Sequence, residues 1–504
     1  MNDKRRSWSF LDTSVEQSYV WSFALTLLPV VSAFAVSWIV ARFAGPGVWG
    51  TVTWAMAFAT TVLILAKLGL DLGASRLASE YGVNRPGALR GLFRTALGLR
   101  LIATLVCAVA TLAAAAPIAG WFGKPELAGV VRMAAAIILC ASLYEFHEHF
   151  LVGLNRHATV SRVRAATLAA RVAITAAIVS AGLGAVHVLA GYVAAWLVGI
   201  SVFALLLHRY LPPADPGAAE GIRSRLLRIS LPLAVSSASV TIYSQMAKLM
   251  LGYFDSVEEV GQYAVALGVV EVALFPSFAF VMTLRPALAS RWARRELEGC
   301  GSLLRDSLRL SLVSGVLFAS IFVVWSVPLI RTVYGDAFAY AGRLMYVFSG
   351  VLVLRAVGAL ILPALVAAER TSVYAWLTTG SALVNFVLNL ILIPRMHASG
   401  AIYATLISYG LLAVVGMTQV FRHFDVHLGR SDLSIIVRTL LAGVVAAASF
   451  WLVREWAAVD TGPGPVLLAA VQAMVFLALV VVVRVVRPEE IRSATRRLVS
   501  PRSS

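Results

Sequence analysis

Four basic residues lie inside segments that are otherwise apolar enough to cross a membrane: Lys67, Arg171, Lys248 and Arg355. A cation near the centre of a bilayer costs roughly 2.5–3.5 kcal/mol on insertion scales, so it usually faces a protein interior or a water-filled cavity. The four residues lie on different apolar segments and at different predicted depths. We therefore expect a chamber in which they contact an anionic group.

Two acidic residues are candidate partners of these cations. Asp71 follows Lys67 by one helical turn, so the sequence predicts that it shares a face with this lysine and is placed to neutralise it. Glu271, central in another apolar segment, is expected either to pair with Arg171 or Arg355 or to serve as a protonatable coupling group. No acidic residue lies within a turn of either arginine, which favours a substrate contact for both.

Two apolar segments also carry polar stripes at three- and four-residue spacing. The first stripe contains Ser237, Thr241, Ser244 or Gln245, and Lys248, and the second contains Thr378, Ser381, Asn385 and Asn389. Each stripe occupies one helical face. Hydroxyl, amide and ammonium groups suit the lining of a polar cavity, but the same residues also form hydrogen bonds between membrane helices. The lysine favours the cavity interpretation for the first stripe.

The composition indicates the kind of scaffold that holds these residues. Of 504 residues, 60% are hydrophobic and 13% are charged, whereas soluble domains are about half apolar and a quarter charged. The chain contains about 14 apolar stretches of roughly 20 residues, each long enough to span a membrane as a helix. The sequence thus predicts an all-α integral membrane protein. The predicted spans are 18–43, 48–72, 95–118, 128–150, 163–184, 186–208, 229–253, 260–284, 304–330, 343–367, 371–393, 398–421, 433–453 and 464–486.

The 42 lysines and arginines are distributed unevenly among the loops. Alternate loops, beginning with the N-terminus, hold about 31 of them, which is the positive-inside pattern. Both termini are therefore predicted to be cytoplasmic. This topology and attraction to anionic membrane lipids explain the net charge of +17 without nucleic acid as a partner.

The chain repeats itself after six spans. The first span ends in Ala44-Gly45-Pro46-Gly47, and an apolar helix then leads into a basic loop; the seventh span and the helix after it follow the same plan. An even number of spans gives both halves the same orientation, as in a parallel repeat. We predict two parallel six-helix bundles around a central cavity, at 1–210 and 229–421, joined by a cytoplasmic linker at 211–228. Residues 422–504 are predicted to form two appended helices and a basic cytoplasmic tail.

No catalytic motif emerges from the sequence. The three cysteines have no metal-binding spacing, and there is no Walker-type phosphate loop. The run Glu145-Phe146-His147-Glu148-His149 matches no zinc motif, because its histidines are only two residues apart. We interpret this run as a helix end that faces solvent or lipid head groups. A transporter without a metal, a cofactor or catalytic residues is expected.

Several short elements occur in a characteristic order. They include Arg42-Phe43-Ala44-Gly45-Pro46, Val260-Gly261-Gln262-Tyr263-Ala264, Val333-Tyr334-Gly335-Asp336-Ala337-Phe338 and Asn389-Leu390-Ile391-Leu392-Ile393-Pro394. With about 14 predicted spans, the chain resembles the polysaccharide-type lipid-linked oligosaccharide flippases of the multidrug/oligosaccharidyl-lipid/polysaccharide exporter superfamily.

This resemblance implies an activity. The protein would move a lipid-diphosphate-linked oligosaccharide across the bacterial inner membrane by alternating access, for lipopolysaccharide, exopolysaccharide or other cell-surface glycan synthesis. A glycan polymerase and a priming glycosyltransferase would be partners.

Two alternatives remain open. A cation-coupled multidrug exporter of the same superfamily is expected to carry an acidic residue in its first bundle, but the first span, Tyr19 to Ala44, has none. A non-transporting scaffold of a polysaccharide assembly complex would keep its role when the buried cations are replaced.

Overall fold

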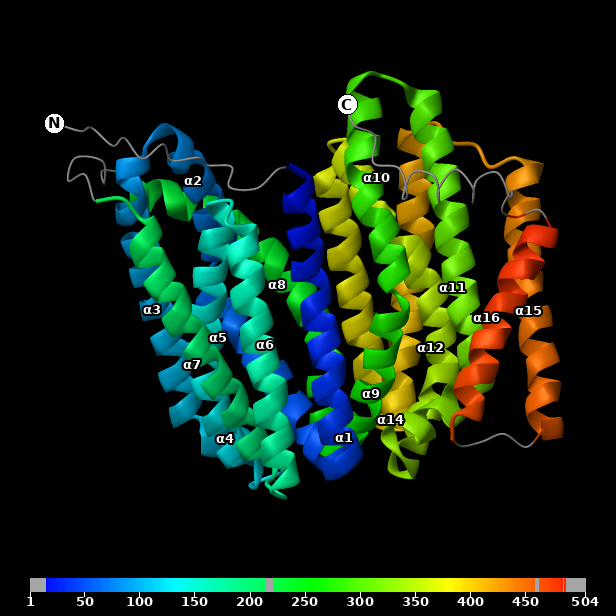
Figure 1. The fold of residues 1–504 in the computed structure, drawn as a ribbon, viewed down its shortest axis with the longest axis horizontal. Coiled ribbons are helices and arrows are strands. Elements are labelled where there is room, and N and C mark those ends of the chain that lie inside the picture. The colour runs from blue at the N-terminus through cyan, green and yellow to red at the C-terminus, as the bar shows by residue number, and fades with distance from the viewer. Residues whose placement is uncertain (1–14, 214–220, 458–461, 484, 486–504) are drawn as a thin grey trace. The chain divides into compact units, whose positions relative to one another are not determined.

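A computed structural model describes residues 15–213, 221–457, 462–483 and 485 (Figure 1). Across these residues the chain forms helices and no β-strand, which confirms the all-α prediction. Ten of the described helices are long and apolar enough to cross a membrane. The protein is therefore a multi-pass membrane protein. The chain divides into two compact units, Met1–Gly261 and Gln262–Ser504, which we describe separately.

Unit 1 contains eight α-helices, a 3₁₀ turn and the start of a ninth α-helix within its described residues. They are α1 (Val15–Lys67), α2 (Leu70–Asn84), η1 (Pro86–Ala88), α3 (Leu89–Ala113), α4 (Ala115–Trp121), α5 (Leu127–Gly153), α6 (His157–Ser180), α7 (Ala185–Tyr210), α8 (Ile222–Phe254) and the first residues of α9 (Val257–Ala273). The helix α8, which we predicted to open the second bundle, packs against α1, α2 and α3 inside this unit. The predicted ends of the first bundle, the linker and the second bundle, at residues 210, 228 and 421, stay predictions.

Helix α1 contains two of the predicted spans. Its backbone leaves helical geometry at Gly45, with φ of 83° and ψ of 176°. Glycine adopts this conformation without the steric penalty that a Cβ atom would impose. Figure 1 shows the start of α1 and the following helix α2 at the same end of the unit, so the chain reverses direction in the turn around Gly45. The predicted break between spans 18–43 and 48–72 corresponds to this turn.

An apolar cluster holds the helices of unit 1 together beside the polar residues described below. Leu77 of α2, Leu92 of α3, Phe150 of α5, Phe203 of α7 and Leu226 of α8 are all fully buried in it. Dispersion contacts of such close-packed side chains stabilise helix association within a membrane, where the surrounding lipid is as apolar as the side chains themselves. The cluster therefore fixes the positions of α2, α3 and α5 relative to one another.

Unit 2 contains the remainder of α9 and seven further α-helices within its described residues. They are α10 (Phe275–Ala293), α11 (Leu297–Tyr334), α12 (Ala339–Gly358), α13 (Ile361–Ala367), α14 (Thr371–His423), α15 (Arg430–Ala457) and α16 (Gly464–Val482), with the 3₁₀ turn η3 (Asp336–Phe338) before α12. Helix α14 again joins two predicted spans, and its backbone turns at His397, with φ of 55°.

The two last helices pack on α11. Val316 of α11, Ala446 of α15 and Phe476 of α16 belong to one buried apolar cluster. A hydrogen bond of 2.7 Å from the Trp325 indole N–H to the Gln472 amide oxygen adds a polar tie between α11 and α16. The appended helices are thus integral to unit 2.

The count of 14 spans stays a prediction. Among the described residues, ten helices are long and apolar enough to span a membrane, but α1 and α14 each contain two predicted spans. The predicted spans 229–253 and 260–284 correspond to α8 and to α9 with α10. Both termini, including the basic tail after residue 485, lie outside the described residues, and the predicted cytoplasmic location of the termini is untested.

Candidate functional site

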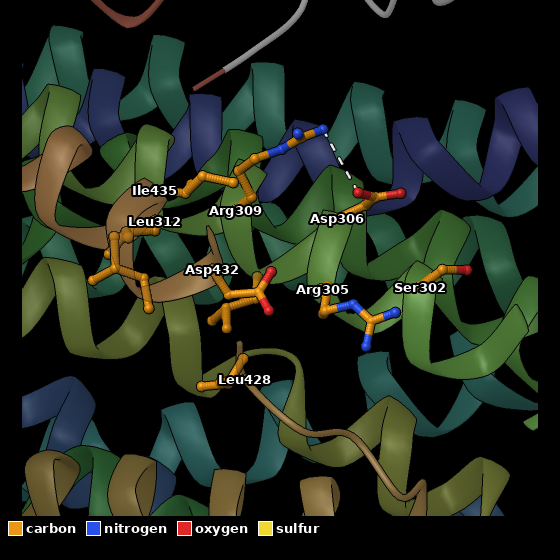
Figure 2. Close-up of a pocket in the computed structure, with 10 residues that line it drawn as sticks. Ser302, Arg305, Asp306, Arg309, Leu312, Leu428, Asp432 and Ile435 are labelled. Atoms are coloured by element: carbon orange, nitrogen blue, oxygen red, sulfur yellow. Dashed lines mark ion pairs between the residues drawn. The ribbon is translucent and has the colours of Figure 1, made fainter. Parts of the chain in front are cut away.

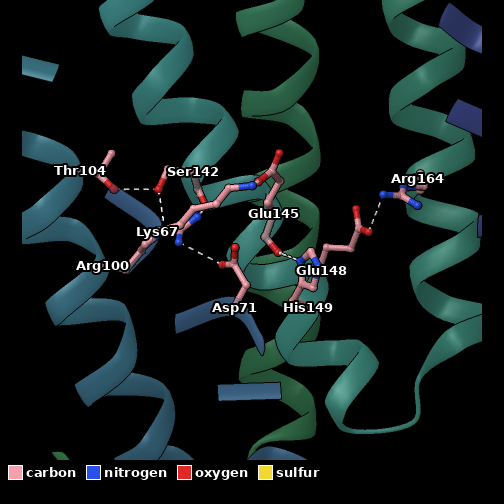
Figure 3. A network of polar contacts seen from close by, with 9 residues as sticks. All are labelled: Lys67, Asp71, Arg100, Thr104, Ser142, Glu145, Glu148, His149 and Arg164. Atoms are coloured by element: carbon pink, nitrogen blue, oxygen red, sulfur yellow. Dashed lines mark hydrogen bonds and ion pairs between the residues drawn. The ribbon is translucent and has the colours of Figure 1, made fainter. Parts of the chain in front are cut away.

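A buried network of charged and hydroxyl side chains joins α2, α3 and α5 in unit 1 (Figure 3). The Arg100 guanidinium of α3 is fully buried and forms an ion pair of 3.1 Å with the Asp71 carboxylate of α2. Arg100 also donates a 2.6 Å hydrogen bond from Nε to the hydroxyl of Ser142 on α5, which is in turn 2.7 Å from the Thr104 hydroxyl. Arg100 therefore has both a charge partner and hydrogen-bond acceptors.

The end of α1 joins the same network. Lys67 Nζ lies 2.5 Å from the Glu145 carboxylate of α5, and both side chains are about two-thirds buried, with 29% and 34% of their surface exposed. Our prediction that Asp71 neutralises Lys67 is wrong, because Lys67 pairs with Glu145 and Asp71 pairs with Arg100. The helix breaks between them, where Leu68 and Gly69 have φ of 48° and 66°, so the two residues do not share one helical face.

The acidic and histidine-rich run on α5 is buried rather than solvated. His147 and Glu148 are 5% and 4% exposed. Glu148 forms an ion pair of 2.7 Å with Arg164 of α6, and Arg164 also donates a hydrogen bond to the Leu25 carbonyl of α1. Our prediction of a helix end facing solvent or lipid head groups is therefore wrong. The acids of this run are ion-pair partners of basic residues on α1 and α6.

Arg171 of α6 has different surroundings. Its Nη2 donates a 2.8 Å hydrogen bond to the Ser32 hydroxyl of α1, and its guanidinium carbon lies 4.8 Å from the centre of the Tyr192 ring of α7. Among the described residues, no carboxylate forms an ion pair with Arg171, and its Nε is buried without a hydrogen-bond acceptor. A hydroxyl and an aromatic face orient this cation while leaving its charge uncompensated.

In unit 2, Arg355 of α12 has a carboxylate partner. Its Nη1 donates a 2.6 Å hydrogen bond to the Glu271 carboxylate of α9, and its guanidinium carbon lies 5.5 Å from the Tyr409 ring centre. The Glu271 side chain is 41% exposed and that of Arg355 is 17% exposed. This pairing was one of the two uses that the sequence indicated for Glu271, while the coupling role stays a prediction.

The first polar stripe lies on α8. Lys248 Nζ donates a 3.2 Å hydrogen bond to the Gln245 amide oxygen, and both side chains are half-buried. Thr241 is also half-buried. Ser237 is part of α8, but its side chain lies outside the described residues. The stripe is continuous along the helix from Thr241 to Lys248, and its role in lining a cavity stays a prediction.

The second stripe is closed against the returning half of its own helix. Asn385 and Asn389 are 2% and 0% exposed. The Asn389 amide donates to the Asn385 amide oxygen at 2.8 Å, and the Asn385 amide donates to the Ser408 hydroxyl at 3.1 Å. The turn at His397 brings Ser408 beside them. This arrangement matches the alternative that these residues bond two helical segments together.

At one end of unit 1, residues of α1 and of the short segment after α4 contact the end of α8 and the start of α9. A Cβ atom on Gly50 would lie 1.7 Å from the Val257 carbonyl oxygen, so only glycine permits this approach. Lys124 donates hydrogen bonds to the carbonyls of Gly252, at 2.6 Å, and Asp255. Burial lowers the pKa of Lys124, although the negative charge of Asp255 opposes this shift. These contacts fasten α1 and the α4–α5 connection to α8 and α9.

The described residues contain no group of three or more histidine, cysteine, aspartate or glutamate side chains placed to hold a metal ion. The network in unit 1 instead alternates acids with bases, and its acids are engaged in ion pairs.

Comparison with known proteins gives this fold a family. Residues 16–292, more than half of the chain, match the family described as polysaccharide biosynthesis protein. The chain belongs to this family. Residues 232–391 also match the MatE family.

Two relatives of the chain are flippases by name. The chain is 26% identical over 181 residues to the "Probable low-salt glycan biosynthesis flippase Agl15" of Haloferax volcanii, which covers 36% of this chain and 38% of that protein. It is 24% identical over 327 residues to the lipid III flippase of Escherichia coli strain K12, which covers 62% of this chain and 75% of that protein. The match thus spans about two fifths of the archaeal relative.

Solved structures confirm the fold. The structure described as lipid II flippase MurJ in an inward closed conformation gives a TM-score of 0.71 at 14% identity, with 92% of this chain and 99% of that chain covered. An inward-facing multidrug resistance MATE family transporter of the MOP superfamily gives a TM-score of 0.67 at 13% identity, over 79% and 96%. The chain therefore has the fold of transporters of the MOP (multidrug/oligosaccharidyl-lipid/polysaccharide) superfamily.

The structure also shows a residue that sequence reasoning missed. Arg100 is the sixth residue of the predicted span 95–118, close to its predicted cytoplasmic end, where an arginine usually extends toward the lipid head groups. Its complete burial depends on Asp71 and Ser142, which come from two other helices. A signal was present, since the sequence carries an acid near the end of span 48–72 and a base near the start of the next span.

Proposed function

We propose that the protein translocates a lipid-diphosphate-linked oligosaccharide across the membrane by alternating access, and that Arg171 contacts the anionic diphosphate. The observation that carries this proposal is the uncompensated charge of Arg171 in the middle of α6, held by Ser32 and Tyr192. A cation in a membrane span is stable when a ligand or a partner supplies negative charge. A diphosphate supplies that charge.

The charge balance of unit 1 favours this substrate class over cationic drugs. Asp71, Glu145 and Glu148 are each paired with a base on a neighbouring helix. A cationic drug would need an available carboxylate, whereas the ion pairs in unit 1 leave a surplus of positive charge at Arg171. Lys67, Lys248 and Arg355 remain further proposed contacts, and the pairing of Lys67 and Arg355 with glutamates makes their contribution smaller.

The family and the named functions of the relatives support the same proposal. Two relatives are flippases of glycan or lipid-linked substrates by name, and a third such name belongs to a structural neighbour. We extend the proposal to a bacterial inner membrane location and to cooperation with a glycan polymerase and a priming glycosyltransferase.

A leaflet assay in proteoliposomes tests the proposal. A lipid-diphosphate oligosaccharide is loaded, and its appearance in the outer leaflet is scored with an impermeant glycosidase. Loss of a charge-assisted hydrogen bond costs about 1.5–3 kcal/mol. Arg171→Gln is therefore expected to raise the substrate concentration that gives half-maximal transport roughly 10- to 150-fold. Arg162, exposed on the same helix, supplies the matched control Arg162→Gln, which is expected to transport normally.

Each outcome separates the hypotheses. Protein-dependent exposure that is lost in Arg171→Gln and retained in Arg162→Gln supports the flippase and its anionic contact. Normal transport by Arg171→Gln at normal abundance refutes the role of Arg171. Absence of glycan exposure together with efflux of a cationic dye would identify a drug exporter, and absence of both activities would favour a scaffold.

A further inference from the structure

A small cavity lies in unit 2 where α11 meets the segment that enters α15 (Figure 2). Its volume is about 150 Å³. The polar residues Ser302, Arg305, Asp306 and Arg309 of α11 line one side, and Asp432, Ile435 and Ile436 of α15 line the other. This end of α11 is the end that the positive-inside pattern predicts to be cytoplasmic.

The charges around the cavity are unevenly satisfied. The Arg309 guanidinium lies 3.6 Å from Asp306, whose side chain is 63% exposed. The Asp432 carboxylate accepts a 2.9 Å hydrogen bond from the Gly429 backbone N–H at the start of α15. Arg305 is half-buried, and in the part of the chain that the structure describes it forms no ion pair with a carboxylate. The cavity therefore presents a guanidinium that is available to an anion.

An apolar groove follows the same two helices. Val316 and Val323 of α11 and Leu440, Gly443 and Ala447 of α15 line a groove of about 440 Å³ whose wall is almost entirely apolar. Leu440 lies four residues after Ile436 of the cavity, which is slightly more than one helical turn, or roughly 6 Å along the helix. The same spacing separates Val316 from Leu312, another residue of the cavity wall. The polar cavity and the apolar groove thus succeed one another along α11 and α15.

We propose that this pair of features is a binding site for an anionic glycerophospholipid of the surrounding membrane. The phosphate would accept hydrogen bonds from the Arg305 guanidinium, and one acyl chain would lie along the groove from Val316 to Ala447. Basic pockets between membrane helices on the cytoplasmic side bind anionic head groups in this way. A free phosphate would leave the groove unfilled, and an uncharged lipid would leave the guanidinium unsatisfied.

Such a lipid would bridge the two helices. It would contact α11 and α15 along several turns and would stabilise the packing of the appended helices on the rest of unit 2. This site is separate from Arg171 and does not depend on the proposed transport activity.

Lipid-dependent thermal stability of the full-length protein in a mild detergent tests the site. Phosphatidylglycerol is titrated against phosphatidylcholine and against inorganic phosphate. The wild type is expected to show a saturable rise in melting temperature with phosphatidylglycerol only. Arg305→Gln is expected to raise the half-saturating concentration of phosphatidylglycerol at least about tenfold, the effect of losing one charge-assisted hydrogen bond. Arg305→Lys is expected to retain part of the affinity. Ala447→Phe, which fills the groove, is expected to weaken binding as well.

Arg422→Gln is the control, because Arg422 is exposed at the end of α14 near the same predicted membrane surface and does not line the cavity. It is expected to bind phosphatidylglycerol as the wild type does. An equal loss in Arg422→Gln would show general electrostatic attraction and would overturn the site. Stabilisation by inorganic phosphate alone, or unchanged lipid binding in both Arg305→Gln and Ala447→Phe, would also overturn it. If Arg305→Gln or Ala447→Phe does not fold, the conservative variant Arg305→Lys takes its place. Its lipid adducts are then measured by native mass spectrometry, and complete loss of selective phosphatidylglycerol adducts counts against the proposal.

Discussion

The buried pair between Asp71 and Arg100 allows a quantitative test of how unit 1 is held together. The Asp71→Asn substitution preserves the shape of the side chain but removes its charge. Arg100 is fully buried and Asp71 is 6% exposed, so solvent does not screen the lost interaction. The substitution leaves an uncompensated guanidinium inside the helix bundle.

The expected magnitude follows from this burial. Removal of one partner from a buried ion pair costs about 3–5 kcal/mol, chiefly because the remaining charge is left without compensation. Arg100 keeps its hydrogen bond to Ser142, so we expect the lower end, about 3 kcal/mol. For folding units of 150–250 residues, about 1 kcal/mol corresponds to roughly 2–4 °C. Asp71→Asn is therefore expected to lower the melting temperature by roughly 6–12 °C.

A double-mutant cycle read by thermal unfolding in detergent isolates the pair. The cycle comprises Asp71→Asn, Arg100→Gln and the double variant. The double variant removes both charges, so it is expected to be more stable than the sum of the single effects predicts, with a coupling energy of about 0.5–3 kcal/mol. The control is Glu80→Gln, which breaks a partly exposed ion pair with Arg225 and is expected to change the melting temperature little, since exposed ion pairs contribute little to stability.

Two results would refute this reasoning. A melting temperature for Asp71→Asn that equals that of Glu80→Gln would show that Arg100 does not depend on Asp71. Strict additivity in the double variant would show that the two side chains stabilise the protein through separate partners. Either result would show that the Asp71–Arg100 ion pair does not help the apolar cluster to hold α2 against α3.

Three further predictions concern packing and pairing. Gly50→Ala places a methyl group against the backbone of α9 and is expected to destabilise the protein by about 1–3 kcal/mol through overpacking. The control Gly98→Ala meets open space and is expected to leave thermal stability unchanged or raised. Equal melting temperatures for the two variants would contradict the close approach at Gly50. Asn389→Ala is expected to lower stability by about 0.6 kcal/mol, the average for hydrogen bonds between membrane helices, with transport per folded molecule preserved; a selective loss of transport would indicate that this side chain contacts substrate. Glu271→Gln is expected to lower thermal stability by leaving the charge of Arg355 uncompensated. Adding Arg355→Gln is expected to restore that stability. Loss of the pH dependence of transport in Glu271→Gln at unchanged stability would favour the coupling role instead.

Part of the candidate site could be predicted from the sequence. Arg171 and Arg355 stand out because charged residues are rare within apolar spans, and the structure places Arg171 near the middle of α6 and Arg355 in the last turn of α12, both within candidate membrane spans. The surroundings that distinguish them could not be predicted. Glu271 pairs with Arg355 from a helix 84 residues away in the chain, while Arg171 meets a hydroxyl and an aromatic ring. Helical periodicity assigns a residue to a face of its own helix, but it does not determine which helix that face meets.

The polar stripe of Asn385 and Asn389 shows the same limit. Its spacing predicts one helical face, which is correct, but spacing alone fits both a cavity lining and a contact between helices. The turn at His397 decides the arrangement by folding Ser408 back onto the stripe. The acidic run at Glu145 and Glu148 was misjudged for a related reason, because its partners Lys67 and Arg164 belong to other helices.

The sequence by itself determined the class of the protein, since a membrane span requires about 20 apolar residues and a helix that satisfies its own backbone hydrogen bonds. It also determined the reversal at Gly45, because glycine readily adopts the backbone conformation found there. Only the tertiary structure decided which charges are compensated. A buried ion pair forms between side chains within about 4 Å of one another, and in this protein helix packing sets those distances, so Arg100 has a carboxylate partner, whereas Arg171 contacts a hydroxyl and an aromatic ring.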